Sequence, residues 1–160
     1  MPPIVSIVGR TNSGKTTLIE KLVAEVKRRG YRVATIKHAQ EIHFEPGKDS
    51  GRHLQAGSEA TIVVTPKEAV LIKPVMPRVK LAEVALLLGE DYDIILAEGF
   101  KQSDAPKIEI RYGGKEPLQN IEKLIAVVSD EAVDGDIRHF STSDVKGIVD
   151  LLEKDFINCG

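Results

Sequence analysis

The chain has 160 residues, of which 22 are basic and 24 acidic, so its formal net charge is −2. This length suits one hydrophobic core, and we expect residues 1–160 to form a single domain. The near balance of charge argues against nucleic acid or an anionic membrane as a partner, and no apolar stretch is long enough to span a bilayer. The N-terminus enters a strand pattern without signal-peptide features, and Cys159 is the only cysteine. We therefore expect a cytoplasmic protein without an internal disulfide.

The first predicted strand, residues 4–8, runs into a segment that fits the phosphate-binding pattern G-x-x-x-x-G-K-[ST], and a helical pattern follows over 17–26. Glycines let backbone N–H groups and a helix N-terminus converge on an anion without a wall of side chains. Lys15 would reach the β- and γ-phosphates of a nucleoside triphosphate, and the Thr16 hydroxyl would bind Mg²⁺. The residues expected to contact the nucleotide in this segment are Gly9, Thr11, Asn12, Ser13, Gly14, Lys15, Thr16 and Thr17.

The remaining elements continue an alternation of apolar runs and helical patterns, which is typical of an α/β fold. A polar loop follows the strand predicted at 31–37, a hairpin turns at Pro66 between the strands 60–65 and 69–73, and a helix is predicted over 79–88. Further strands are expected at 93–98, 107–111, 124–129 and 137–140, and Ser143 is expected to cap a helix over 144–156. We therefore predict a P-loop NTPase-type three-layer sandwich, a mostly parallel sheet with helices on both faces and an antiparallel hairpin.

A carboxylate ends the strand predicted at 93–98. Ligands of open α/β sheets bind beyond the carboxyl ends of the strands, so Glu98 would hold Mg²⁺ or its water where such sites usually have aspartate. The alternative is a strand-ending acid that faces water, and the phosphate-binding pattern favours the metal. Asp91 and Asp93 precede the strand and are expected to be turn residues.

The polar segment after the strand 31–37 is dense in charge and imidazole. We expect that strand to lie beside the strand 4–8, so that the segment orders around the γ-phosphate as a switch. Asp49 would bind the metal, and Arg52 or Lys37 would neutralise phosphate charge; a solvated loop is the alternative. The histidines of this segment are His38, His43 and His53. Their spacing matches no strong metal signature, although a transition-metal site remains an open alternative.

Together these elements resemble the molybdopterin-guanine dinucleotide biosynthesis protein B family, over nearly the whole chain. The glycine-rich pattern alone names only a superfamily, whereas the later elements are more specific. The resemblance is carried by that pattern, the Lys37-His38 strand end, the Gly47-Lys48-Asp49-Ser50-x-Arg52 element followed by Ala56-Gly57, and the Glu98-Gly99-Phe100-Lys101 strand end. The stretch from Ala39 to His43 departs from the acidic or histidine-rich stretch of many members.

The resemblance implies a GTP-binding accessory protein with weak GTPase activity, usually dimeric, which assists the guanylyltransferase that attaches GMP to molybdopterin. GTP and Mg²⁺ would be its ligands. Its partners would be a second copy, that guanylyltransferase and, as further candidates, molybdopterin or a molybdoenzyme. Lys15, Asp49 and Glu98 would serve catalysis, with Thr16, Asp49 and Glu98 at the metal.

Guanine recognition needs a separate reader, because the Asn-Lys-x-Asp element of GTPases is absent. A carboxylate accepts from guanine N1–H and N2–H₂ and meets the N1 acceptor of adenine unfavourably. Asp130, after the strand 124–129, is the candidate, and an Asx turn or helix cap is equally open.

Two other functions remain open beside the accessory GTPase. One is an ATP-dependent kinase or ligase for a small metabolite, because related folds use the same phosphate loop. The other is a metallochaperone GTPase, for which the histidines are the only motive. The apolar hairpin at 60–73 favours a homodimer that covers its edge.

Overall fold

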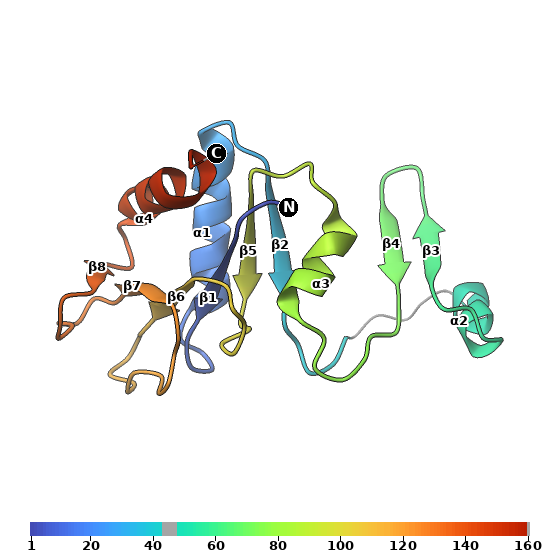
Figure 1. The fold of residues 1–160 in the computed structure, drawn as a ribbon, viewed down its shortest axis with the longest axis horizontal. Helices are drawn as coiled ribbons and strands as arrows, with labels where there is room; N and C mark the ends of the chain where they lie inside the picture. The colour runs from blue at the N-terminus through green and yellow to red at the C-terminus, as the bar shows by residue number, and fades with distance from the viewer. Residues whose placement is uncertain (43–47, 160) are drawn as a thin grey trace. The chain divides into compact units, whose positions relative to one another are not determined.

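The computed structural model describes residues 1–42 and 48–159 (Figure 1). The chain forms two compact units, residues 1–38 with 80–160 and residues 39–79. The expectation of a single domain stays a prediction. The strands are β1 Ile4–Val8, β2 Val33–Lys37, β3 Thr61–Val64, β4 Ala69–Ile72, β5 Ile94–Glu98, β6 Lys107–Ile110, β7 Leu124–Val128 and β8 Arg138–Phe140. The helices are α1 Lys15–Arg28, α2 Lys48–Gln55, α3 Leu81–Ala85 and α4 Val145–Leu152, with a 3₁₀ turn at Leu86–Leu88 and a π-helical turn at Glu153–Ile157.

The larger unit is built on a six-stranded sheet in the order β2-β5-β1-β6-β7-β8, and every neighbouring pair is parallel. The predicted fold class is therefore confirmed. The prediction that β2 lies beside β1 was wrong, because β5 lies between them. Parallel strands are joined by crossovers, so the order along the chain does not fix which strands pair. As a result, Glu98 is in register with Ile7 on one side and Lys37 on the other.

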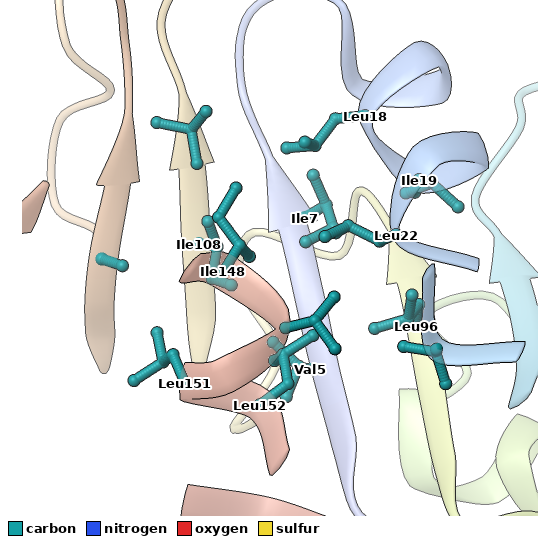
Figure 2. Close-up of a cluster of buried hydrophobic side chains, with 14 of the residues drawn as sticks. Val5, Ile7, Leu18, Ile19, Leu22, Leu96, Ile108, Ile148, Leu151 and Leu152 are labelled. Carbon is teal, nitrogen blue, oxygen red and sulfur yellow. The ribbon is translucent and has the colours of Figure 1, made fainter. Parts of the chain in front are cut away.

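Helices cover both faces of this sheet. Figure 2 shows Leu18 and Leu22 of α1 and Ile148 of α4 among the side chains that form the larger hydrophobic cluster. α3 covers the opposite face, where Leu81 and Ala85 belong to a second cluster with residues of β2 and β5. Side chains alternate between the two faces of a strand, so an apolar run such as β1 is buried on both sides.

A cluster of charged side chains connects the C-terminal end of α1 to α4 and to the turn that follows it. Arg29 Nη1 donates to Asp150 Oδ1 at 2.6 Å and to Glu153 Oε2 at 2.7 Å, while its Nε donates to Glu25 Oε1 at 2.9 Å. Arg28 donates two hydrogen bonds to the same Glu25 carboxylate. The donors of Arg28 and then Arg29 lower the pKa of Glu25 to about 2. The carboxylate is therefore held in its charged form in the folded protein.

The smaller unit contains α2 and the antiparallel pair β3–β4, which confirms the predicted hairpin. At its turn, Thr65 Oγ1 accepts hydrogen bonds from the backbone of Lys67 and Glu68. The prediction of a polar loop ahead of this hairpin was wrong over residues 48–55, where the chain forms α2. That segment contains Gly51 and little apolar surface, so helix propensity and hydrophobic periodicity give weak signals there.

The start of α4 also differs from the prediction. Asp144 rather than Ser143 is its N-cap, and the Asp144 carboxylate accepts a 3.0 Å hydrogen bond from the backbone N–H of Gly147. Ser143 lies instead with its hydroxyl 3.0 Å from that of Ser141. Two adjacent residues of good capping type leave the boundary of a helix open by one position. No helix in residues 1–42 and 48–159 is long and apolar enough to cross a membrane.

Candidate nucleotide site

Residues 9–14, which we call the glycine loop, connect β1 to the first turn of α1 (Figure 1). Gly14 has a φ of 91°, in the left-handed region that favours glycine. A Cβ atom on Gly9 would lie 2.5 Å from Ser13 Oγ and 2.7 Å from the carbonyl oxygen of Ile110. Both glycines are therefore required by the backbone path and by its close contact with β6.

Lys15 lies across the glycine loop. Its Nζ donates hydrogen bonds to the carbonyl oxygens of Gly9, at 3.1 Å, and Arg10, at 2.9 Å. Partial burial lowers the pKa of Lys15, the charge of Glu98 opposes that shift, and the nearby Lys115 and Lys37 add to it. The ammonium thus lies among other cations beside the loop, where an anionic ligand would relieve their repulsion.

Glu98 meets the beginning of α1 at the end of β5. Thr16 Oγ1 donates a 2.9 Å hydrogen bond to Glu98 Oε1, and Lys37 Nζ lies 3.7 Å from the same oxygen. The Glu98 side chain is 15% exposed, so it does not simply face water. A hydroxyl and a carboxylate are oxygen ligands of the kind Mg²⁺ takes, together with phosphate and water. These two predicted metal ligands therefore fit that ion.

The hydroxyl of Ser13 adds a second sign of a ligand at the loop. Ser13 is 1% exposed, and its Oγ has no hydrogen-bond partner among the described residues. Buried polar atoms are normally paired, so an unpaired hydroxyl needs an explanation. A phosphate oxygen would accept a hydrogen bond from this hydroxyl.

A cationic pocket of about 450 Å³ adjoins the glycine loop. Arg10 Nε donates to the carbonyl oxygen of Glu116 at 2.8 Å, and Lys115 Nζ donates to that of Thr11 at 2.6 Å. These two contacts hold the loop after β6 against the glycine loop. The pocket is lined by Gly9, Arg10, Thr11, Lys101, Lys115 and Leu118. Lys101 and Lys115 were not predicted as site residues: Lys101 was noted only as part of the Glu98-Gly99-Phe100-Lys101 strand end, and Lys115 belongs to no motif.

Asp130 lies at the end of β7 and is bound to the loop after β8. Its Oδ1 accepts a 2.8 Å hydrogen bond from the backbone N–H of Thr142, and its Oδ2 accepts a 2.5 Å bond from Thr142 Oγ1. These donors lower the pKa of Asp130. Asp130 is exposed, and each oxygen keeps a second lone pair that is able to accept from a base.

The remaining predicted residues belong to the smaller unit or have other contacts. Asp49 and Arg52 are on α2 in the smaller unit, 4.0 Å from one another and exposed to 93% and 79%, and a part for Asp49 in the site stays a prediction. His53 is on the same helix, and His43 lies outside the described residues. The His38 ring packs edge-on against Phe100, with 5.2 Å between ring centroids. Within the described ranges, no group of three or more histidine, cysteine or carboxylate residues is placed to hold a metal ion.

Comparison with known proteins identifies the family. The family model for molybdopterin guanine dinucleotide synthesis protein B, MobB, matches residues 4–130. The molybdopterin-guanine dinucleotide biosynthesis adapter proteins of Haemophilus influenzae and Escherichia coli are 33% and 32% identical to the chain; the alignments cover 94% and 95% of it and 88% and 92% of those proteins.

Solved structures of MobB proteins support the same family assignment. A MobB homologue from Bacillus stearothermophilus aligns with a TM-score of 0.71 at 30% identity, over 95% of this chain and 96% of that one. Bacillus subtilis MobB aligns with a TM-score of 0.74 at 29% identity, over 98% and 99%. The chain therefore belongs to the MobB family of molybdopterin-guanine dinucleotide biosynthesis adapter proteins.

Proposed function

We propose that the chain is a GTP-binding adapter with weak GTPase activity, which acts with a guanylyltransferase in the formation of molybdopterin guanine dinucleotide. The observation that carries this proposal is the contact between Thr16 and Glu98 beside Lys15. It brings a hydroxyl, a carboxylate and an ammonium to the glycine loop, which are the groups that a Mg²⁺-bound triphosphate needs. The family assignment supports the pathway, and a cytoplasmic location remains a prediction.

Slow hydrolysis follows from how Glu98 is engaged. Mg²⁺ would neutralise charge that develops on the phosphates, and Lys15 would share that task. Glu98 Oε1 accepts a hydrogen bond from Thr16 Oγ1 and lies 3.7 Å from Lys37 Nζ, which suits a metal ligand better than a group that orients the attacking water. Fast turnover would need a further group to orient that water. We propose that a partner protein supplies it.

A titration of GTP, ATP and their diphosphates with Mg²⁺ tests this proposal. We expect GTP to bind more tightly than ATP, and the Lys15→Ala variant to lose nucleotide binding while its circular dichroism stays unchanged. The matched control is Lys27→Ala, on the exposed side of the same helix. Unchanged GTP affinity in Lys15→Ala would reject the site. Hydrolysis by the chain alone at roughly tens of turnovers per second would reject the weak activity.

The hairpin of the smaller unit supports a homodimer. Ile62, Val64 and Leu71 are 61%, 71% and 41% exposed, and Ile62 is paired directly with Leu71 across the two strands. These three side chains share one face of the pair, because residues two apart on a strand, and residues directly opposite, point the same way. An isolated pair of short strands is only marginally stable in water. We propose that a second copy of the chain covers this apolar face.

The cationic pocket is compatible with one alternative function, an ATP-dependent kinase or ligase for a small metabolite. Arg10, Lys101 and Lys115 line it without an acidic neighbour among its lining residues. A kinase or ligase would bind its phosphorylated or carboxylated metabolite there. Nucleotide turnover that rises sharply with such a metabolite, and not with a guanylyltransferase, would favour this alternative.

A further inference from the structure

A second pocket, of about 350 Å³, adjoins the glycine loop. Its volume falls in the range of small-molecule pockets, about 300 to 1,000 Å³. It begins at the backbone that would hold phosphate, and its other walls come from α1, from the end of β6 and from the loop after β8. The lining residues are Asn12, Ser13, Gly14, Thr17, Leu18, Lys21, Ile110, Tyr112 and Thr142.

The character of this pocket differs from that of the cationic pocket. Leu18 and Ile110 are buried, at 3% and 5% exposure, and give it an apolar floor. Tyr112 is 62% exposed and supplies an aromatic ring at its edge. A nucleotide has a charged end and a flat base with apolar faces, and bases stack on aromatic side chains. The apolar pocket therefore suits the nucleoside, while the cations around Gly9 suit the outer phosphate.

The loop that carries Tyr112 is held in place. The Glu109 carboxylate, 2% exposed, accepts hydrogen bonds from Arg111 Nε and Nη2 at 3.0 and 2.7 Å, and from the backbone N–H of Leu118 at 2.7 Å. On the other side of Tyr112, the N–H of Gly114 donates a 3.0 Å bond to Glu131 Oε1. A ring on a fixed loop loses little conformational freedom when a ligand binds, which favours affinity.

Two charged groups suit the edge of a guanine base. Lys21 lines the pocket and interacts electrostatically with Asp130, whose carboxylate is bound to Thr142 at the pocket wall. An ammonium donates to the O6 acceptor of guanine, whereas adenine presents an amino group at that position. Lys21 in the lining, and the Asp130 carboxylate that is hydrogen-bonded to the lining residue Thr142, thus complement guanine better than adenine.

We infer that this pocket binds the nucleoside of a guanine nucleotide, with Tyr112 stacked on the base and Lys21 at its polar edge. This inference rests on the proposed function, because it assigns the second half of the same nucleotide site. Neither residue belongs to the phosphate-binding pattern. The roles of Tyr112 and Lys21 are therefore testable separately from phosphate binding.

The test compares GTP with inorganic tripolyphosphate, both with Mg²⁺, by calorimetry. Tripolyphosphate carries the phosphates without the nucleoside. We expect Tyr112→Ala to weaken GTP binding about tenfold, as the loss of one stacking contact does, and to leave tripolyphosphate binding unchanged. Tyr112→Phe keeps the ring and should bind GTP like the unmodified chain. Lys21→Ala should reduce the preference for GTP over ATP, whereas Lys27→Ala should not.

The outcomes separate the two proposals. If Tyr112→Ala and Lys21→Ala bind GTP like the unmodified chain while Lys15→Ala does not, the pocket assignment is wrong and the phosphate site stands. The same conclusion follows if the unmodified chain binds tripolyphosphate as tightly as GTP. If it binds neither ligand, the proposed function fails. A thermal melt checks that Tyr112→Ala is folded, which its exposure leads us to expect.

Discussion

Thr16 and Glu98 are 82 residues apart in sequence, yet the Thr16 hydroxyl donates a 2.9 Å hydrogen bond to the Glu98 carboxylate. The contact exists because β5 pairs with β1, so that β5 ends beside the start of α1. Parallel strands end at the same edge of a sheet, where ligands of open α/β folds bind. This pair is therefore the structural centre of the proposed Mg²⁺–GTP site.

Replacing Glu98 by Gln should weaken the Mg²⁺-dependent part of GTP binding. Gln keeps the size and one oxygen but loses the charge, and changes around a metal typically cost about 10- to 100-fold in its affinity. GTP affinity measured with Mg²⁺ and with a chelator separates this effect from phosphate binding. Asp91→Asn is the control, since Asp91 is an exposed acid before β5. An equal loss with and without Mg²⁺ would contradict the metal role.

Replacing Asp130 by Asn should exchange guanine preference for xanthine preference. A carboxylate accepts from the N1–H and N2–H₂ of guanine, whereas an amide is able to donate to the O2 of xanthine. We expect GTP affinity to fall roughly 10- to 100-fold, as for a lost hydrogen bond to a charged group, and xanthosine triphosphate affinity to rise. Competition binding measures both. A similar fall for both nucleotides would mean that Asp130 acts only by holding Thr142.

A lysine at Ile62 should separate the proposed homodimer. Burying an unpaired charge in an apolar interface is costly, and loss of a central contact weakens association by roughly 30-fold or more. Analytical ultracentrifugation of Ile62→Lys at several concentrations measures the change. The control is Leu86→Lys, at a position 68% exposed in the larger unit. A monomeric unmodified chain at micromolar concentration would exclude the dimer.

Acid should weaken the ion cluster between α1 and α4. The pKa of Glu25 falls from 4.5 to about 2 in the folded chain. A carboxylate with a lowered pKa stabilises the fold above its unfolded pKa, and this contribution is lost as pH falls from about 4.5 through about 2. We expect Glu25→Gln to be less stable to urea at pH 7 and to depend less on pH in that acidic range. Glu20→Gln, on the exposed surface of the same helix, should retain the pH dependence of the unmodified chain.

Local sequence patterns determined much of the larger unit. The apolar run of β1, the glycine loop and the periodic residues of α1 are contiguous, so composition and spacing were sufficient to predict them. The buried strand before Glu98 was predicted for the same reason. The helix α2 was missed, because eight mostly polar residues with an internal glycine have low intrinsic helix propensity.

Tertiary structure decided which of these elements meet. The insertion of β5 between β1 and β2 brings Glu98 to both Thr16 and Lys37, and no local pattern encodes that order. The burial of Lys107 is another feature that the local sequence does not predict. It is fully buried, and its Nζ donates to the carbonyl oxygens of Ser103, Ala105 and Glu122, whereas the residue type alone predicts exposure.

The sequence by itself thus determined the glycine loop with its flanking strand and helix, because these depend on neighbours along the chain. Only the tertiary structure decided that Thr16 lies against Glu98, that Asp130 is bound to Thr142, and that Tyr112 lines a pocket beside Gly14. Such contacts depend on strand order and on the loops at the strand ends, and both are set by packing between residues far apart in the chain.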